Sequence, residues 1–463
     1  MKNPEIIQKG IEAGKNNLNS KDEAAHTAGD YYNLANGYHA LFRLTERKIG
    51  TEVIPQSQNL QKAKFNFRSA IKHSKIGVFN CQKLAWVNYG NCLSDLGRGI
   101  EAIYAYDNAL KIDKNFSMAI GSKARELQFF ADISMKYREA IYVEAYQALK
   151  SIIEKPDLIE IGGASSKKAF ESELKRIEGL CKDKELLARP INYEKYDTKR
   201  LSKFELFYID FCVKEKLFLN FHVHHEACRA AIIDPIFISI VTKIDDMDTF
   251  YIYAKHINQI KEDYAVARLL LVQSQFKRRD FDRISKRTTL INTLDYSQFN
   301  LYLGLLKTAF EEAYNILDKI AVFINDYYKF GLPERDIYFD SISIWEEKRI
   351  IRKEILTSKN ISLYALYDIY CDFKSKYYAE IKKIRNASTH RRLVIFDSTF
   401  SKTIKNDGNY NISLETMLHE TISLLRLTKS AIIYLINFVN MEENKKKGNG
   451  LIAPMVADST QFL

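Results

Sequence analysis

Residues 86–109 decide the fold of the N-terminal third of the chain, and they read WVNYGNCLSDLGRGIEAIYAYDNA. Apolar and small residues recur in this stretch at helical spacing, which predicts two consecutive helices. Small residues at Gly90 and Ala102 allow the two helices to approach closely, and aromatic rings fill the groove beside them. The stretch therefore predicts a pair of antiparallel helices.

The spacing of these residues resembles a tetratricopeptide repeat, which is a helix pair of about 34 residues. Lys114 stands where that repeat usually ends in proline, a tolerable departure. The residues that carry the resemblance are Trp86, Tyr89, Gly90, Leu93, Ala102, Tyr106 and Ala109.

Two further copies flank this one. Residues 119–127 and 140–149 indicate a degenerate third repeat, and three repeats are about the minimum for a stable array. Within the upstream copy an insertion around Pro55 is expected to form a loop on one face. The upstream copy is built from Tyr31, Leu34, Ala35 and Tyr38 in one helix and Ala63, Phe67 and Ala70 in the other.

The composition favours a globular helical protein. Hydrophobic residues make up 46% of the 463 residues, and only 7 prolines and 18 glycines interrupt the chain. The net charge of +11 favours a polyanionic partner.

The six cysteines are scattered, which is typical of reduced thiols in a cytosolic protein. No signal segment follows Met1, and no run approaches the ~18 apolar residues of a membrane helix. We therefore expect a cytoplasmic protein without a membrane partner.

The pattern of breaks predicts an all-α protein with four parts. These are a helical repeat array over 1–160, a less regular connecting segment over 161–247, a helical bundle over 248–442 and a flexible tail over 443–463. Glycines at 162–163 and Pro190 interrupt the connecting segment. The bundle is expected to contain four helices, over 295–328, 343–356, 360–385 and 414–439.

Residues 382–392 read KKIRNASTHRR and contain the side chains whose chemical roles are easiest to assign. Histidine exchanges a proton near neutral pH, and the planar fork of arginine fits phosphate oxygens. His390 would assist attack by a ribose 2′-OH on its own phosphate or protonate the departing 5′ oxygen. Arg385 would stabilise the charge that develops on the phosphorane. This chemistry needs RNA and no metal or other cofactor.

The helix that carries Arg385 is expected to begin after a cap at Asn360. Asn386, Ser388 and Thr389 prefer caps and turns. A five-residue step along an unbroken helix would leave Arg385 and His390 about 140° apart. We therefore expect the helix to end or distort at Arg385, so that both side chains face one pocket.

The arginine, the polar residue after it and the histidine five positions on resemble the signature of the HEPN superfamily. Arg385, Asn386 and His390 match it residue by residue, over a region of roughly 250–440. The resemblance implies a metal-independent endoribonuclease that acts as a homodimer through the C-terminal bundle, with both motifs lining one cleft. It also implies a toxin or an anti-phage defence effector. A solvated basic helix end is the alternative interpretation.

Further basic residues are candidates for RNA binding. They are Arg391 and Arg392 after the motif, and Lys277, Arg278, Arg279 and Arg283 in the densest basic run before it. That run is explained equally well as a surface that binds a phosphate backbone and as a solvent-exposed helix face. The segment from His222 to Cys228 combines histidines, Glu226 and a cysteine, but without a second ligand pair at zinc spacing. It is more simply a polar edge or an RNA-facing wall, so no metal site is assigned.

The leading hypothesis is an endoribonuclease that leaves 2′,3′-cyclic phosphate and 5′-OH ends. Its N-terminal repeats would bind a protein or peptide partner that restrains or triggers it. The alternative is a non-catalytic scaffold protein, in which the repeats and the bundle both serve assembly. An intact Arg385 and His390 favours the enzyme, because a scaffold does not need this pair.

Overall fold

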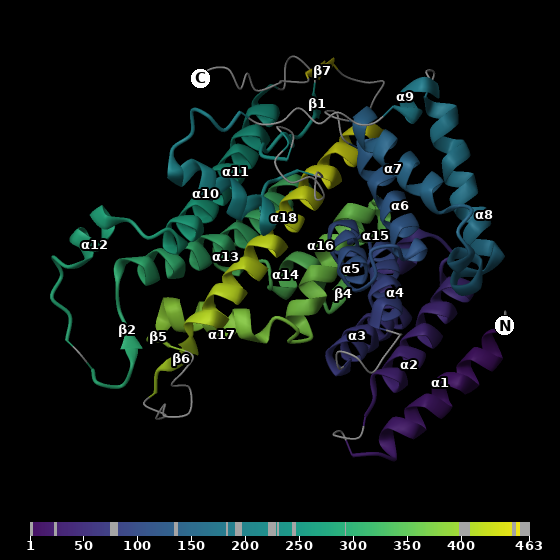
Figure 1. Ribbon diagram of the computed structural model, residues 1–463, viewed down its shortest axis with the longest axis horizontal. Helices are drawn as coiled ribbons and strands as arrows, with labels where there is room; N and C mark the ends of the chain where they lie inside the picture. Colours follow the sequence, from purple (N-terminus) through teal and green to yellow (C-terminus); the bar gives the residue numbers. More distant parts are fainter. Residues whose placement is uncertain are drawn as a thin grey trace. The chain divides into compact units, whose positions relative to one another are not determined.

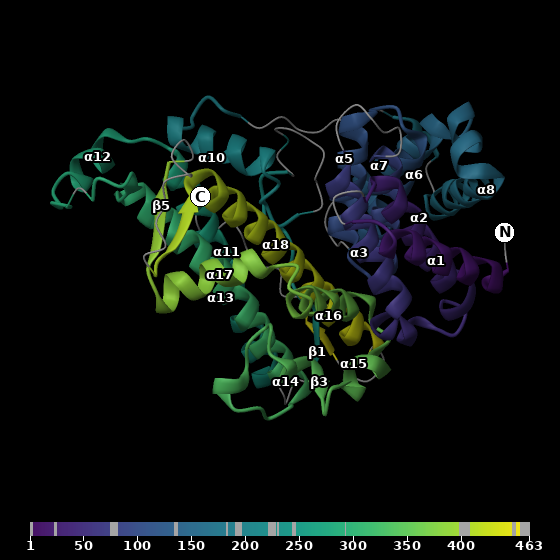
Figure 2. The same ribbon diagram turned by 90° about the horizontal axis from the view of Figure 1, so that it is seen from below.

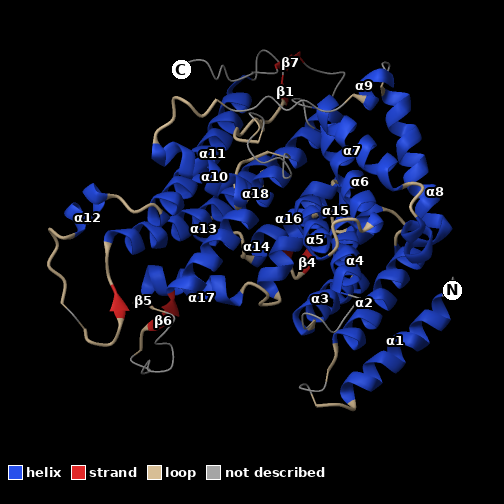
Figure 3. Ribbon diagram, in the orientation of Figure 1, coloured by secondary structure: helices blue, strands red, loops and turns tan. Residues whose placement is uncertain are grey.

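The computed structural model describes residues 3–22, 26–74, 82–133, 138–181, 184–189, 197–220, 228, 231–242, 247–291, 293–397, 408–446 and 451–453. Over these residues the secondary structure is mainly helical, with a few short strands (Figure 3). The all-α class predicted from the sequence is confirmed. The chain divides into two compact units, one of Met1–Asn192 with Ile355–Ala365 and one of Tyr193–Glu354 with Leu366–Leu463.

The N-terminal unit is built from helices that pack in consecutive pairs (Figures 1 and 2). The pairs α2/α3, α4/α5 and α6/α7 lie where the repeat pattern predicts them, and their assignment to the tetratricopeptide class stays a prediction. The helices are α1 Pro4–Asn19, α2 Ala28–Leu41, α3 Gln58–His73, α4 Gln82–Asp95, α5 Gly99–Ile112, α6 Ser117–Ile133, α7 Arg138–Ile152, α8 Pro156–Leu180 and α9 Lys184–Ala188.

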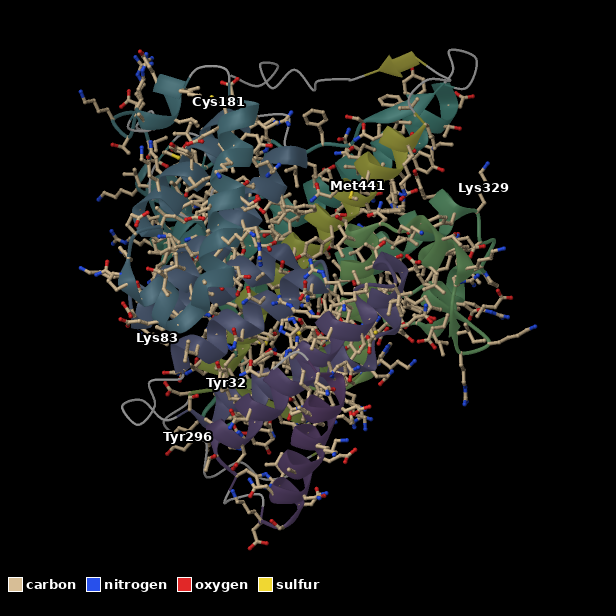
Figure 4. The ribbon with its side chains drawn as sticks, turned by 90° about the vertical axis from the view of Figure 1, so that its right-hand side faces the viewer. Tyr32, Lys83, Cys181, Tyr296, Lys329 and Met441 are labelled. Atoms are coloured by element: carbon tan, nitrogen blue, oxygen red, sulfur yellow. The ribbon has the colours of Figure 1, made fainter. Side chains whose placement is uncertain are left out.

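A glycine sets the close approach of α4 and α5. A Cβ atom on Gly90 would lie 2.5 Å from Cε1 of Tyr106, well inside the ~3.5–4.0 Å of an ordinary carbon contact. Tyr106 is fully buried, and its hydroxyl donates to Asn91 Oδ1 at 3.0 Å. The neighbouring pair is joined to this one by Asn88, whose amide donates to the hydroxyl of Tyr32, labelled in Figure 4, at 3.0 Å.

The insertion between α2 and α3 is ordered into helical turns, so the expected loop is not observed. A π-helical turn η2 (Phe42–Glu46) extends α2, and a 3₁₀ helix η3 (Thr51–Gln56) follows it. Apolar residues of the insertion are buried, including Ile54 and Pro55. Arg43 and Arg47 form ion pairs with Asp95 of α4 at 2.9 and 3.0 Å. These contacts fix the insertion to the helices beside it.

Three long helices form the core of the second unit, with α13 packed against both α11 and α18 (Figure 1). The helices that this unit contains or shares with the first are α10 Lys203–Lys214, α11 Met247–Gln275, α12 Arg279–Ser285, α13 Leu301–Tyr328, η5 Glu334–Asp336, α14 Ile342–Trp345, α15 Lys353–Ser358, α16 Ile361–Lys374, α17 Ala379–His390 and α18 Leu414–Lys445.

The helix α18 is long and apolar enough, by length and composition, to cross a membrane. The expectation that no run of the chain approaches the length of a membrane helix was therefore wrong. In the structure 83% of its apolar window is buried inside the protein. Fully buried residues on α18 include Leu424, Ile432 and Phe438. This pattern is that of the central core helix of a globular unit.

Two of the four expected bundle helices differ in the structure. Residues 343–356 form the short α14, a β-hairpin of β3 (Glu346–Glu347) and β4 (Ile350–Ile351), and α15. Lys348 and Arg349 both have positive φ, which is the geometry of a tight hairpin turn. The helix expected over 360–385 is two helices, because α16 ends where Lys376 adopts the left-handed conformation at φ 64°. Asn360 caps α16 as predicted, accepting from the backbone of Ser362 at 3.1 Å.

Short strands connect distant segments within the second unit. β5 (Leu393–Phe396) pairs antiparallel with β2 (Ser297–Gln298) and parallel with β6 (Tyr410–Ser413). β1 (Ile240–Thr242) pairs antiparallel with β7 (Leu451–Ala453), which lies in the segment expected as a tail. In the three-stranded sheet, β5 begins three residues after His390, the last residue of α17.

Candidate active site

The helix α17 presents the motif residues on different faces. Its buried face consists of Ile381, Ile384 and Ala387, which recur at the spacing of one helical stripe. Arg385 is half-buried, while Asn386 and His390 are exposed. The apolar stripe therefore fixes α17 to the unit and leaves the histidine at its end accessible to solvent.

The expected break at Arg385 is absent, since α17 runs without interruption to His390. Ser388 and Thr389 are accommodated because their hydroxyls donate to the Arg385 carbonyl oxygen at 3.1 and 2.9 Å. Such back-bonding lets these residues occupy a helix interior. Five residues of continuous helix separate the two side chains by about 140° and about 7.5 Å along the axis. The prediction that the helix ends or distorts at Arg385 was therefore wrong.

Arg385 lies over an aromatic ring of the neighbouring helix α13. The guanidinium carbon is 5.3 Å from the ring centroid of Tyr314, within the range of a cation–π contact. One helical turn further along α13 is Asp318, which accepts the backbone N–H of Phe339 at 2.9 Å. Burial raises the pKa of Asp318 to about 6, opposed by that hydrogen bond and by the charge of Arg385. Arg385 is thus half-buried and packs against α13.

A second ion pair joins α17 to the same region. Lys382 pairs with Asp340 at 2.5 Å. At the start of α17, the hydroxyl of Tyr410 donates to Glu380. Burial and this carboxylate raise the pKa of Tyr410. The start and the middle of α17 are therefore held by charged contacts, whereas the described contacts of its last turn are backbone and hydroxyl bonds.

The two arginines after the motif lead directly into the sheet. The N–H of Arg391 caps α17 by donating to the Ala387 carbonyl at 3.1 Å, and the carbonyl of Arg392 accepts the N–H of Tyr410 at 2.9 Å. Both arginines are exposed. Lys307 of α13 donates to the Leu393 carbonyl at 2.8 Å. The backbone here is anchored on two sides, so the position of both arginines relative to α17 is defined.

The basic run before the motif lies on and beside α12. Lys277, Arg279 and Arg283 are exposed. Arg278 differs, because it pairs with Asp280 at 2.6 Å and lies 4.5 Å from the ring centroid of Phe281. Its charge is therefore partly neutralised locally, which makes it the weakest of the four predicted phosphate contacts. After α12 the chain continues to β2, which pairs with β5.

The histidine-rich segment 222–227 lies outside the described residues, and Cys228 beside it is buried. Over the part of the chain that the structure describes, no group of three or more metal-ligating side chains is present.

Tyr314 and Asp318 are not among the site residues predicted from the sequence. Both lie on the apolar stripe of α13, next to fully buried Leu317 and Ile320. A carboxylate within such a stripe requires a polar partner, and this was the available signal. Their role as neighbours of Arg385 depends on the packing of α17 against α13, which the sequence pattern alone does not specify.

Comparison with known families identifies the region that contains this site. Residues 244–442 match the family model described as LA2681-like HEPN. Comparisons with curated proteins and with solved structures found no match. The matched residues span α11 to most of α18 and include α17 with its arginine and histidine. HEPN regions are generally associated with ribonuclease-type activity and with RNA binding. The C-terminal region of this chain is therefore a HEPN-superfamily domain.

Proposed function

We propose that this protein is a metal-independent endoribonuclease. In the reaction the ribose O2′ forms a bond to the adjacent phosphorus, and the bond from phosphorus to O5′ breaks. The proton of the 2′-OH leaves to a base, and the departing 5′ oxygen gains a proton. His390 serves one of these proton transfers, while Arg385 stabilises the charge on the phosphorane oxygens. The products carry 2′,3′-cyclic phosphate and 5′-OH ends.

The observation that carries this proposal is the exposure of His390 at the end of a firmly held helix. Nothing in its position serves the core, because the apolar stripe of α17 ends at Ala387. Exposed basic residues follow it at Arg391 and Arg392. A proton-transfer group beside cationic side chains is the arrangement that a phosphodiester substrate requires. Asn386, also exposed, is proposed to hydrogen-bond the substrate phosphate or His390.

The separation of Arg385 from His390 supports a site that two copies of the chain complete. Within one copy the two side chains diverge around α17, and Arg385 faces Tyr314. A two-fold axis near α17 would place the His390 of one copy near the Arg385 of the other, since a symmetric interface uses the same surface twice. The proposed functional form is therefore a homodimer through the C-terminal domain.

The N-terminal helix pairs are proposed to regulate the nuclease and not to carry its chemistry. Paired helices form extended surfaces suited to proteins or peptides. An unrestrained ribonuclease harms its host, so a cytoplasmic toxin or defence effector needs such a receptor. Toxicity on expression in cells should then change when a trigger or inhibitor is supplied, while cleavage by the purified active chain should not.

The test of the activity is incubation of the purified full chain with RNA in excess EDTA, followed by analysis of the product ends. Cleavage with 2′,3′-cyclic phosphate and 5′-OH ends is expected, and the His390→Ala chain should be inactive. Product ends with 5′-phosphate, or activity that EDTA abolishes, would contradict the mechanism. Absence of cleavage by a folded dimer would favour the scaffold alternative, in which Arg385 only joins α17 to α13.

A further inference from the structure

One helix belongs to both units. α16 runs without interruption from Ile361 to Lys374 (Figure 1). Its residues up to Ala365 group with the N-terminal unit, and those from Leu366 onward group with the second unit. The helix has 14 residues and is therefore about 21 Å long. α16 is thus a continuous element whose two ends are packed in different units.

The start of α16 contacts a loop of the N-terminal helix pairs at very short range. Gly97 lies between α4 and α5 and has a φ of +83°. A Cβ atom on Gly97 would lie 2.3 Å from the carbonyl oxygen of Ile361 and 2.9 Å from its Cγ1. Two residues before Ile361, Lys359 forms an ion pair with Glu52 of η3 at 3.5 Å. Because the space at Gly97 admits no side chain, the loop fixes the first turn of α16 within the N-terminal unit.

The last turns of α16 pack beside the candidate active site of the second unit. The ring of Phe373 meets the ring of Tyr314 edge-on, with 6.2 Å between centroids. The Tyr314 ring is the one that Arg385 contacts. Phe373 also lies 6.2 Å from the ring of Phe339, whose backbone N–H donates to Asp318. The neighbours of Phe373 are therefore the residue that supports Arg385 and the residue bound to Asp318.

Further contacts hold the last turns of α16 in place. Tyr370 stacks on Trp345 with 5.8 Å between ring centroids, and its hydroxyl donates to Glu346 at 3.2 Å. Lys374 forms an ion pair with the same carboxylate at 2.6 Å. Because packed interiors have few voids, these turns cannot absorb a shift of the helix without moving their neighbours.

Phe373 also reaches the residue that precedes α17. Its ring centroid is 4.9 Å from that of Tyr378, which stands directly before α17. A displacement of α16 therefore acts on α17 at its start and on Arg385 through Tyr314. Misplacement of a catalytic group by about 1 Å can lower a rate about 10²-fold. A small shift of α16 is thus sufficient to control a site that uses Arg385.

We propose that Phe373 is a positioning residue for Arg385, and that α16 transmits to it the state of the N-terminal unit, from Gly97 through Ile361. This inference rests on the proposed ribonuclease function and specifies how that activity is regulated. An event that moves the loop at Gly97, such as binding of the partner proposed for the N-terminal helix pairs, shifts α16 and changes the placement of Arg385.

Gly97→Ala tests this link, because the new Cβ would press on the start of α16. Gly163→Ala on α8 is the matched control, since Gly163 also has a positive φ of 72° but no atom within 4 Å of the position of its Cβ. Hydrogen–deuterium exchange of the purified full chains is followed by mass spectrometry. Gly97→Ala should speed amide exchange in α17 by about fivefold or more, and Gly163→Ala should not. Exchange in α10 of the second unit is the internal reference and should not change.

Phe373→Leu interrupts the link at its other end. In this background Gly97→Ala should no longer change exchange in α17, because residues coupled along one path are not additive. If the wild-type chain cleaves RNA, Gly97→Ala should also lower kcat by about 10- to 100-fold with little change in KM. In the Arg385→Ala background it should cause no further loss, because it acts through Arg385.

The inference is overturned if α17 exchanges equally fast in the Gly97→Ala and Gly163→Ala chains, or if exchange in α10 rises as much as exchange in α17. Simple addition of the effects of Gly97→Ala and Phe373→Leu would also overturn it. Should Gly97→Ala fail to fold, Ile361→Ala, which shortens the side chain at the same contact, is judged by the same criteria.

The outcomes separate this inference from the proposed function. Exchange needs no substrate, so it decides the role of α16 even if the wild-type chain cleaves nothing and the nuclease fails. If the wild-type chain cleaves RNA and Gly97→Ala changes neither exchange in α17 nor kcat, the link fails and the nuclease stands.

Discussion

The guanidinium carbon of Arg385 lies 5.3 Å from the ring centroid of Tyr314, and this contact joins α17 to the core helix α13. The arginine is therefore both a candidate catalytic group and part of the α13–α17 packing. His390, five residues further along, is a candidate catalytic group only. It is exposed, so it takes no part in the packing of α17 against α13. Substitutions of the two residues should consequently differ in their effect on stability even where they agree in their effect on activity.

We predict that His390→Ala lowers cleavage by about 10²–10⁴-fold, the usual contribution of a positioned proton-transfer group. Its thermal unfolding should match that of the wild-type chain. Arg385→Ala should lower cleavage by about 10²–10³-fold through loss of charge stabilisation, together with a measurable fall in Tm. Initial rates and thermal melts of both variants check this. Wild-type turnover in the His390→Ala chain would remove this residue from the mechanism.

Asn386→Ala should impair cleavage less than either of these changes. Its side chain is exposed and can hydrogen-bond a phosphate oxygen, but it neither transfers a proton at neutral pH nor carries a charge. Loss of one neutral hydrogen bond costs about 0.5–1.5 kcal/mol, which corresponds to roughly a twofold to 13-fold fall in rate. Kinetics of the folded variant provide the measurement. A loss as large as that of His390→Ala would assign Asn386 an essential role.

The sequence predicted helices well where packing and periodicity agree. The helix pair around Gly90 and Tyr106 is present because its small and aromatic residues interlock. The helix end predicted at Arg385 was wrong. That prediction was based on the preference of Ser388 and Thr389 for caps and turns over helix interiors. The structure shows that their hydroxyls bond back to the Arg385 carbonyl, which removes that conflict.

Contacts between residues far apart in the chain were not predictable from local pattern. Arg268 of α11 is buried and forms hydrogen bonds to both carboxylate oxygens of Asp234, at 3.1 and 2.7 Å. Lys429 of α18 is also buried and donates to the Lys216 carbonyl at 3.0 Å. These bonds attach the less regular segment to the helical core. Each partner is an ordinary surface residue type, so nothing in the sequence marks the pairing.

The pH dependence of the free energy of unfolding should reveal the pKa of Asp318, which is raised to about 6. The native state binds this proton more tightly than the unfolded chain does. The associated stability is therefore full below the ordinary carboxyl pKa and is lost as pH rises through about 6. Asp318→Asn removes the ionisation but keeps an acceptor for the Phe339 N–H.

This variant should be more stable than wild type above pH 7 by at most about 3 kcal/mol, and nearly equal to it at pH 4. Urea unfolding at the two pH values measures the difference. Asp263→Asn, which removes the ion pair with Lys319 of α13, is the control and should show no such gain. A gain for Asp318→Asn that is equal at both pH values would show that ionisation is not its cause.

A site shared between two copies makes a prediction about mixed dimers. Arg385→Ala chains and His390→Ala chains should each be inactive alone. If the cleft combines the arginine of one copy with the histidine of the other, a mixed dimer contains one intact set. Random mixing should then restore roughly a quarter of wild-type activity. Native mass spectrometry verifies that mixed dimers form. Their formation without recovered cleavage would place both groups of each site on one chain.

The last prediction concerns the close approach of α4 and α5. Gly90→Ala should destabilise the N-terminal unit by about 1–3 kcal/mol, the usual cost of overpacking, because the new Cβ would lie 2.5 Å from the ring of Tyr106. Gly10→Ala on α1 is the matched control, since no atom lies within 4 Å of the position of its Cβ. It should stabilise by about 0.5–1 kcal/mol through helix propensity.

The two substitutions share the same gain in helix propensity, so the difference between them isolates the steric contact. Tyr106→Leu removes the ring that the new methyl group would meet. In the double variant Gly90→Ala/Tyr106→Leu, the loss of stability should therefore be smaller than the sum of the two single losses. Chemical denaturation of the four chains measures this coupling. Strict additivity would mean that Tyr106 is not the residue that requires glycine at position 90.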